Sequence, residues 1–492
     1  MKQVCRSENV SMKSIIIKAL FLFVVTASTV LAADKPNVLF IIADDASRHY
    51  GKAYNCDWAK TPNIDSLTAN GLVFDNAYVP TSKCGPCRSA IMTGRNPWQL
   101  GPGANHQAVF PHEHKAFGEA LSAAGIACGN AGKTWGPGTA NDKNGKKRDF
   151  GLTVFNKKSG FEEFLAKKKE GAPGSPFFFW YGSSNPHRGY PLGAGVKKGK
   201  KLTDIDRVPA YWPDNDTIRG DMLDYSTEIE AFDNEVGNLL AVLKKTGHAD
   251  NTIVIVTSDH GMPFPRVKGH TYDDAHRVPF IVHWPGVTKS TRRVADLITL
   301  TDLAPTFFDI FGVKADMEFT GHSMVDLFRD KPRIERPFVI IGRERNDVNT
   351  RPGYPNGAGY PARGIRMGDH LYIYNFKPDR WPCGNPDMGL RDTDNSPTKR
   401  FVIDLGQGDK FWEHSFGKRP SAQLFNVVKD PDCVSNLASK TDTADLEKQL
   451  RDTLMAELKR QNDPRVLGKG ETFDNYLSRK RPTKKPKKKK KK

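Results

Sequence analysis

The chain has 492 residues, which is more than one simple hydrophobic core usually organises, so two packed regions are expected. A hydrophobic content of 38%, with 10% aromatic residues, supplies a folded interior and excludes a wholly disordered chain. The net charge is +18, but eleven Lys and Arg residues lie within 479–492, so the rest of the chain carries only about +7.

The first residues have the features of an export signal. Lys13 precedes an apolar run over residues 15–30, which ends in small residues at Ala32. A positive start, a hydrophobic stretch and a small-residue cleavage site are typical of a signal peptide. The run is too short for a lasting membrane span. We therefore predict a signal peptide over residues 1–32 and a periplasmic or secreted protein.

After the leader, short apolar runs alternate with longer helical stretches, which predicts a mainly parallel sheet covered by helices. Residues 37–43 form an uninterrupted apolar run, which is typical of a strand buried on both faces. Thr61 and Pro62 open a short helix that ends near Leu67. Further strands are predicted at 126–130, 177–181 and 253–257.

Polar side chains follow each of these strands directly. In open α/β sheets, ligands bind outside the carboxyl ends of the strands, so the four segments are expected to deliver these side chains to one edge. The residues concerned are Asp44 and Asp45, Lys133, His187, and Asp259 with His260.

The pattern changes near residue 335. Strand-like segments at 337–341 and 371–375 lie among Pro- and Gly-rich loops, and a helix is predicted at 443–460 from the recurrence of Leu at every fourth position. The predicted class is therefore α/β, with a large mixed, mainly parallel sheet flanked by helices and a smaller C-terminal α+β region. The predicted boundaries are a catalytic domain at 34–330, a smaller region at 331–465 and a basic tail at 466–492.

The basic tail favours a disordered, solvated polycation, with attachment to anionic surfaces or sulfated polysaccharide as the functional alternative. Nucleic acid is not expected as a partner, because export removes the chain from it. Seven cysteines are present, of which Cys5 belongs to the leader. The spacing of the other six indicates neither a disulfide framework nor a zinc site, and one or two bridges are left unassigned.

Residues 84–88, Cys-Gly-Pro-Cys-Arg, fit two chemistries. A Cys-x-x-Cys pair is a redox signature of thioredoxin-like proteins. Its context here does not fit that scheme, because Lys83 precedes the motif and Ser89 to Arg95 have no place in it. The alternative explains the whole segment.

Cys-x-Pro-x-Arg followed by Ser-x-Ile-x-Thr-Gly, at 84–94, resembles the signature of the sulfatase family. Similar segments occur across the mature chain, and they are Asp44-Asp45 with Gly51; Thr61 to Asp65 with Gly71, Phe74 and Ala77; Gly132-Lys133; Ser258 to Gly261; Lys268-Gly269 with Val278-Pro279; and Ala422 to Asn426 with Asp430-Pro431 and Asn436-Leu437. The resemblance implies an alkaline-phosphatase-like fold.

The resemblance also implies the site chemistry. A maturation enzyme would oxidise Cys84 to formylglycine (3-oxoalanine), whose hydrate attacks sulfur to give a sulfo-enzyme intermediate. A calcium ion would be held by an oxygen-rich set that also includes residue 84. The implied metal ligands are Asp44, Asp45, Cys84, Asp259 and His260.

Four further residues have roles that the resemblance implies. Arg88 would hold the aldehyde hydrate, and Lys133 and Lys268 would place positive charge against the sulfate oxygens. His187 would bind sulfate and protonate the leaving group. The chain departs from the family pattern after Lys133: a histidine is commonly present two or three residues later, and Trp135 or Gly136 occupies that place here. The candidates to replace it are His106, His112, His114, His270 and His276.

The predicted function is an exported sulfatase that hydrolyses sulfate esters or sulfamates of a sulfated glycan. The motifs look closest to the sulfamidase (heparan N-sulfatase) and iduronate-2-sulfatase branches, and N-sulfate and O-sulfate are left open. Arg343 to Arg345 and Arg363 to Arg366 are candidate sugar contacts. Two alternatives remain: a phosphomonoester or phosphonate hydrolase of the same superfamily, and a non-catalytic polyanion-binding relative.

Overall fold

The computed structural model describes residues 35–171, 174–332, 336–352 and 357–478. The described residues from Pro36 onward form one compact unit. The predicted signal peptide, 1–32, and the part of the predicted tail at 479–492 lie outside the described residues. The beginning of that tail is described: it contains helix α14 (Thr472–Asn475) and buries Phe473, so residues 466–478 belong to the described fold. No helix within the described ranges has the length and apolar character needed to span a bilayer.

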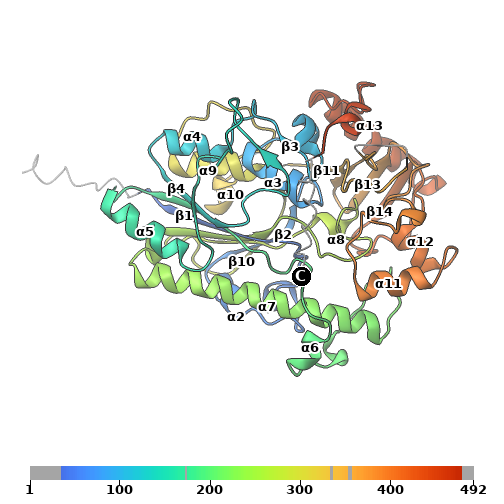
Figure 1. Ribbon diagram of the computed structural model, residues 1–492, viewed down its shortest axis with the longest axis horizontal. Coiled ribbons are helices and arrows are strands. Elements are labelled where there is room, and N and C mark those ends of the chain that lie inside the picture. Colours follow the sequence, from blue (N-terminus) through green and yellow to red (C-terminus); the bar gives the residue numbers. More distant parts are fainter. Residues whose placement is uncertain (1–34, 172–173, 333–335, 353–356, 479–492) are drawn as a thin grey trace, which may run out of the picture. The chain divides into compact units, whose positions relative to one another are not determined.

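The predicted fold class is confirmed by a mainly parallel, eight-stranded sheet between two layers of helices (Figure 1). Among its strands, β9 alone runs antiparallel to its neighbours, β2 and β8. In spatial order the strands are β10 (Arg292–Thr299), β2 (Leu72–Tyr78), β9 (Phe280–His283), β8 (Thr252–Ser258), β1 (Asn37–Ala43), β7 (Phe177–Gly182), β4 (Ala127–Gly132) and β6 (Thr153–Phe155). The four strands expected from the apolar runs are β1, β4, β7 and β8, which lie side by side and parallel.

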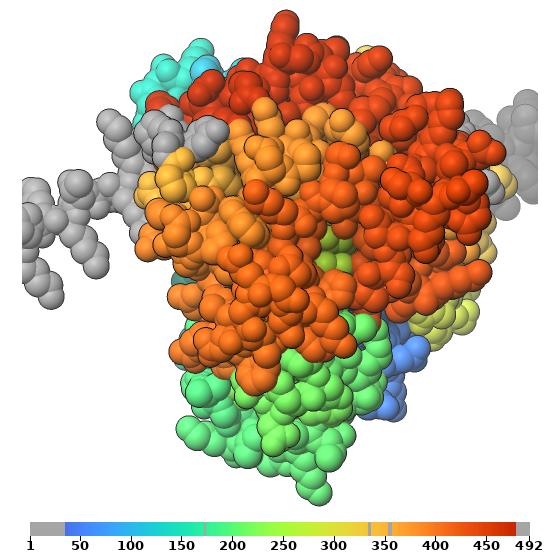
Figure 2. Space-filling view, turned by 90° about the vertical axis from the view of Figure 1, so that its right-hand side faces the viewer, coloured from blue at the N-terminus to red at the C-terminus, as the bar shows by residue number. Residues whose placement is uncertain are grey.

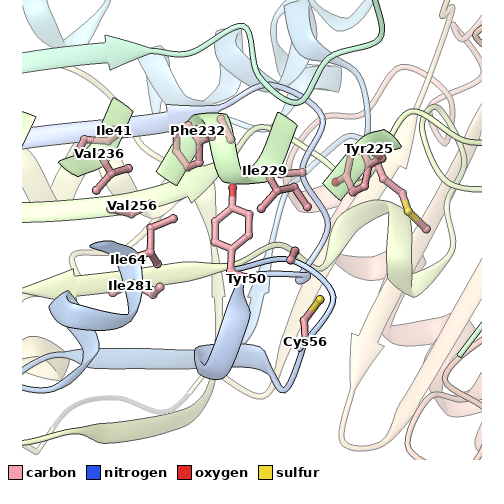
Figure 3. Packing of buried hydrophobic residues seen from close by; sticks show 14 of the residues in the cluster. Ile41, Tyr50, Cys56, Ile64, Tyr225, Ile229, Phe232, Val236, Val256 and Ile281 are labelled. Carbon is pink, nitrogen blue, oxygen red and sulfur yellow. The ribbon is translucent and has the colours of Figure 1, made fainter. Parts of the chain in front are cut away.

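Strand β1 is buried at all seven positions because helices cover both faces of the sheet. One apolar core lies under α7 (Asp216–Lys245), α2 (Pro62–Thr68) and α5 (Gly160–Gly171), where Figure 3 shows Phe232 and Val236 of α7 near Ile41 of β1. The ring of Tyr50 points toward α7, with its centroid 5.9 Å from that of Phe232. The opposite core is covered by α3 (Cys84–Thr93), α4 (Phe117–Ala123), α9 (Leu303–Phe311) and α10 (Val325–Phe328).

A second sheet follows in the C-terminal region. It is antiparallel, in the order β11 (Phe338–Arg343), β12 (Ala362–Met367), β13 (His370–Asn375) and β14 (Ala422–Asn426). Helix α13 (Ala444–Arg460) packs on it through Leu450, Leu454 and Leu458, as the four-residue leucine spacing predicted. Figure 2 shows this region, in orange and red, over much of the face turned to the viewer. The division at residue 330 stays a prediction; β10 ends before it and β11 begins after it.

The remaining elements are short and lie in the connections. Strands β3 (Val109–Phe110) and β5 (Thr139–Ala140) form a two-stranded parallel pair near the end of β4. The other helices are α6 (Ala194–Lys197), α8 (Asp273–His276), α11 (Pro397–Asp404) and α12 (Lys410–Phe416).

Candidate active site

Cys84 is the first residue of α3 and faces the carboxyl ends of β1 and β8. Lys83 before it is extended, with φ −147° and ψ 136°, so the helix starts at Cys84 itself. The Sγ atom lies 3.3 Å from Nε2 of His260 and 3.9 Å from Oδ1 of Asp45. Burial alone would raise the pKa of this thiol, but Lys133 and His260 hold it well below its usual range. The position therefore stabilises an anionic group.

Two acidic pairs meet at this point. Asp44 and Asp45 follow β1 directly, Asp259 and His260 follow β8, and these strands are adjacent and parallel. The backbone N–H of Asp45 donates to Oδ1 of Asp259 at 3.1 Å. His260 Nε2 lies 3.1 Å from Oδ1 of Asp45 and 3.6 Å from Oδ1 of Asp259. Asp45 has φ 75°, which is unusual for a residue with a side chain and typical of constrained sites.

Three cations hold these carboxylates. Arg88 donates from Nε to Oδ2 of Asp259 at 2.8 Å. Lys133 reaches both oxygens of Asp44, at 2.6 and 2.7 Å. Nζ of Lys268 lies 2.6 Å from Oδ2 of Asp45. Arg88 also lies 3.5 Å from Oδ1 of Asp44, so each predicted carboxylate is paired with at least one predicted cation, and Lys133 is the only one of these six side chains that is more than 5% exposed, at 23%.

The electrostatic balance differs among the three acids. Burial and the neighbouring Asp259 raise the pKa of Asp44, against the effect of Lys133. Burial also opposes ionisation of Asp45 and Asp259. Even so, Lys268 lowers the pKa of Asp45, and His260 lowers the pKa of Asp259. Burial likewise opposes protonation of His260, yet Asp259 and Asp45 raise its pKa to about 9. Like charges are therefore crowded here in a low-dielectric setting, which favours a bound cation.

The donor set fits a divalent metal ion. Four residues each offer one ligand atom, and these atoms lie within 4.8 Å of one another: Asp44, Cys84, Asp259 and His260. A second, overlapping group consists of Asp44, Asp45 and His187. Carboxylate oxygens dominate, which suits a hard cation such as Ca²⁺ better than a thiolate-seeking metal. The structure thus brings together all five residues that the sequence suggested as metal ligands.

His187 lies at the mouth of this cluster. It follows β7 through the segment Asn185-Pro186, and its Nε2 is 3.9 Å from Oδ2 of Asp45. Its Nδ1 faces the carbonyl oxygen of Arg188 at 2.9 Å, and 40% of its side chain is exposed. The imidazole therefore has one nitrogen fixed by the backbone and the other turned toward the carboxylates.

A pocket of about 720 Å³ opens from the same corner. Its walls combine apolar surfaces with polar groups, and the lining residues are Asp44, Lys133, Trp135, Gly136, Pro137, Ser184, Asn185, His187 to Pro191 and Glu228. Trp135 Nε1 donates to Oγ of Ser89 at 2.8 Å, and its ring packs edge-on against Phe110. The indole thus forms a fixed apolar wall beside Lys133.

Of the five candidates for the missing histidine, His106 is the one that reaches residue 84. Its imidazole lies beside the first turn of α3, with Cδ2 3.7 Å from the position that a Cβ on Gly85, the residue after Cys84, would occupy. His270 instead contacts Sγ of Cys383, and His276 faces two backbone carbonyl groups. Two further candidates lie beyond β3 and make no described contact with the site: His112 and His114.

Three charged residues near the site were not predicted. Nζ of Lys83 lies 3.0 Å from Oδ2 of Asp347, and Nζ of Lys268 lies 2.9 Å from Oδ2 of Asp394. Both carboxylates come from loops of the C-terminal region, where no motif marks them. The only signal available for Lys83 was its position directly before the cysteine motif.

The suggestion that Arg343, Arg345, Arg363 and Arg366 contact sugar is wrong. All four are at most 3% exposed. Arg363 forms ion pairs with Glu344 and Asp463, and Arg366 donates from Nε to the Tyr78 hydroxyl at 3.0 Å. These arginines are buried because the second sheet and its neighbouring loops close over them, which a sequence pattern of single basic residues does not reveal.

The cysteines of the described chain are all buried and free. Cys87 lies within α3 among apolar side chains, and burial raises the pKa of its thiol well above its usual range. A thioredoxin-like pair needs a reactive, accessible thiolate, and this arrangement does not provide an accessible pair.

Comparison with known proteins identifies relatives over most of the chain. A family model described as Sulfatase matches residues 36–313. An ulvan-active sulfatase of Formosa agariphila is 26% identical over 462 residues, covering 86% of this chain and 74% of that protein. The N-sulphoglucosamine sulphohydrolase of Homo sapiens is 27% identical over 496 residues, covering 90% and 93%.

The fold is likewise shared with solved structures. One was determined in complex with its substrate D-glucosamine-2-N,6-O-disulfate; it superposes with a TM-score of 0.61 at 18% identity, covering 87% of this chain and 98% of the other. At that identity the likeness establishes the architecture, and the chemistry has to be argued from the residues themselves.

Proposed function

This chain belongs to the sulfatase family and is a sulfuric ester hydrolase related to N-sulphoglucosamine sulphohydrolase; from that premise we propose that it cleaves sulfate esters or sulfamates of a sulfated polysaccharide or glycosaminoglycan at Cys84. The observation that carries the proposal is the position of Cys84. It begins a helix, is 2% exposed, and faces three carboxylates and three cations that come from the ends of β1, β4 and β8, from α3 and from the loop after β8.

In this proposal a maturation enzyme converts Cys84 to formylglycine before the enzyme acts. Its hydrate supplies two hydroxyl groups, one to attack sulfur and one whose proton loss expels sulfate. The Sγ atom at 84 stands in for one of these oxygens. Because Sγ lies 3.3 Å from Nε2 of His260, that oxygen would face the acidic cluster.

The remaining groups act on the sulfate and its leaving group. Lys133 and Lys268 hold positive charge beside residue 84, where negative charge grows on the sulfate oxygens in the transition state. His187 has an exposed edge toward the pocket, which suits donation of a proton to a leaving alcohol or amine. A Ca²⁺ ion held by Asp44, Asp45, Asp259, His260 and residue 84 would supply Lewis acidity to the sulfate.

The pocket supports a carbohydrate as the leaving group. Its 720 Å³ volume and the fixed indole of Trp135 suit the apolar face of a sugar ring, while Ser184 and Asn185 offer hydrogen bonds to hydroxyl groups. The names of the relatives are consistent with this class, since they act on ulvan or on N-sulphoglucosamine. Both sulfamates and sulfate esters remain within the proposal.

Export and attachment are part of the same proposal. The predicted signal peptide would direct the chain to the periplasm or the exterior, where sulfated polysaccharides are found. The lysine-rich end at 479–492 would attach it electrostatically to anionic surfaces.

The test combines mass mapping with a substrate panel. Protein produced with a competent maturation enzyme is digested, and the peptide that contains residue 84 is weighed. The same preparation, with calcium, is assayed for sulfate release from defined N- and O-sulfated oligosaccharides. Aldehyde at residue 84 together with sulfate release supports the proposal.

Two other results would replace it. Unmodified Cys84 with no sulfate release, but with retention on a heparin column, would favour the polyanion-binding alternative. A higher kcat/KM on phosphate or phosphonate esters than on sulfate esters of the same aryl alcohol would favour the other hydrolase class.

A further inference from the structure

Trp135 stands in the place of the missing histidine, and its side chain cannot accept a hydrogen bond as an imidazole can. Trp135 lies two residues after Lys133, and its only polar atom, Nε1, already donates to Ser89 at 2.8 Å. An indole N–H is a donor only and accepts no hydrogen bond. A hydroxyl of residue 84 that needs an acceptor must therefore find it elsewhere.

His106 offers that acceptor from another part of the chain. It follows the short helical turn η3 (Gly101–Ala104), is 6% exposed, and lies beside both Cys84 and Gly85. Its Nδ1 is 3.0 Å from the carbonyl oxygen of Asn346 and 3.2 Å from Oδ1 of Asp347. A backbone carbonyl only accepts, so Nδ1 carries the hydrogen and Nε2 is left as the acceptor in the neutral ring.

Asp347 is held firmly enough to fix this ring. Its Oδ1 also accepts from Gln107 Nε2 at 2.8 Å, and its Oδ2 pairs with Lys83 at 3.0 Å. Its own backbone N–H donates to Oδ1 of Asp392 at 3.1 Å. The carboxylate is thus held by Gln107, the residue after His106, and by Lys83, the residue before Cys84.

We propose that Asp347 is a positioning residue of the active site, which orients His106 so that Nε2 accepts a hydrogen bond from a hydroxyl of residue 84. His106 thus supplies the acceptor that the sequence after Lys133 lacks, and the C-terminal region holds it in place through Asp347. The proposal rests on the proposed function, because the hydroxyl belongs to the modified form of residue 84. The orientation of the His106 ring by Asp347 can be measured whether or not Cys84 is converted to formylglycine.

The kinetic test compares Asp347→Asn, Asp347→Glu, His106→Gln and the double variant Asp347→Asn/His106→Gln. Loss of a carboxylate that orients an imidazole typically lowers activity by about 10- to 100-fold. We expect kcat to fall by that factor in Asp347→Asn, with KM within about twofold, and partial recovery in Asp347→Glu. The double variant should be no slower than the slower single variant, because both substitutions disrupt the same oriented imidazole beside residue 84.

Asp432→Asn is the matched control. Asp432 is a buried carboxylate of the same region that pairs with Arg207 and makes no described contact with the active site. It should leave kcat within about twofold. A merely structural role for Asp347 would lower thermal stability as much in Asp347→Glu as in Asp347→Asn and would give multiplicative losses in the double variant. That result, or unchanged kcat in Asp347→Asn, would overturn the proposal.

A second readout needs no activity. In protein labelled with ¹⁵N-histidine, the His106 signals are assigned by their loss in His106→Gln. They should show a hydrogen on Nδ1 in the parent and a mixture of tautomers in Asp347→Asn. Failure of the proposed function, seen as unmodified Cys84 in the parent, leaves this measurement intact. An unchanged tautomer in Asp347→Asn would contradict the orienting role.

Discussion

Nε of Arg88 lies 2.8 Å from Oδ2 of Asp259, and neither side chain is exposed. The same guanidinium donates from Nη1 to the Lys133 carbonyl oxygen at 2.5 Å and from Nη2 to that of Ala43 at 3.4 Å. Helix α3 is thereby tied to the ends of β1, β4 and β8. One arginine holds together the segments that contribute the candidate nucleophile, the acids and a lysine.

Replacement of this arginine should therefore destabilise the protein as well as inactivate it. Arg88→Ala leaves Asp259 buried without its partner, and removal of one member of a buried pair costs about 3–5 kcal/mol. The free energy of unfolding from urea titration measures this loss. Lys448→Ala, which removes a largely exposed pair with Asp452, should change it by less than about 0.5 kcal/mol. Equal effects of the two changes would contradict the role of Arg88.

Removal of Cys84 should abolish turnover without unfolding the chain. Cys84→Ala is expected to lower sulfate release by about a thousandfold or more, because no other group takes the place of a covalent nucleophile. Cys87→Ala is the control, since Cys87 packs among apolar side chains of the same helix and should retain activity within about threefold. Comparable losses in both variants would instead favour a chemistry that uses the two cysteines as a pair.

Metal removal should act on the same cluster. We expect EDTA to suppress sulfate release and added Ca²⁺ to restore it, because three carboxylates converge on residue 84. Calcium should also raise the melting temperature of the chelated protein, as a ligand of the folded state does. Asp259→Asn should weaken both responses. Full activity in a metal-free preparation, verified by elemental analysis, would be incompatible with this site.

Glu228 should make the pocket disfavour substrates that carry a second sulfate group. It lines the pocket from α7, and no ion pair with it is present among the described residues. A carboxylate there repels a second sulfate by about 1 kcal/mol in a partly solvated site. Glu228→Gln is expected to raise kcat/KM for a disulfated sugar about three- to tenfold relative to a monosulfated one. Glu230→Gln, on the same helix but away from the pocket, should leave this ratio unchanged.

Asp274 should make stability depend on pH. Burial and the neighbouring Asp273 raise its pKa to about 6, from an ordinary value near 3.8. The folded protein therefore binds this proton more tightly than the unfolded chain, so the carboxyl reduces stability as pH rises from about 4 through 6. Asp274→Asn should raise the melting temperature relative to the parent at pH 7 and much less at pH 4. The exposed Asp250→Asn serves as control; a difference independent of pH would refute the assignment.

Much of the fold followed from local pattern. The run Asn37–Ala43 carries no polar interruption after its first residue, and such a run is stable only between two helical layers, so the sequence alone indicated β1 and its parallel neighbours. Because parallel strands end at one edge of a sheet, the sequence alone predicts a common site for Asp45, Lys133 and Asp259. The family signature around Cys84 added the expected roles.

Tertiary structure decided what depends on contacts between distant segments. Asp347 lies 241 positions from His106 along the chain, and neither has a motif; only the closure of the C-terminal loops over residue 84 brings them to 3.2 Å. Packing around the second sheet likewise buries Arg363, which pairs with Glu344 and Asp463 but looks like an ordinary surface arginine in the sequence. Periodicity and motifs report the environment of a residue within its own element, whereas pairing across elements is fixed by how the two sheets and their loops pack.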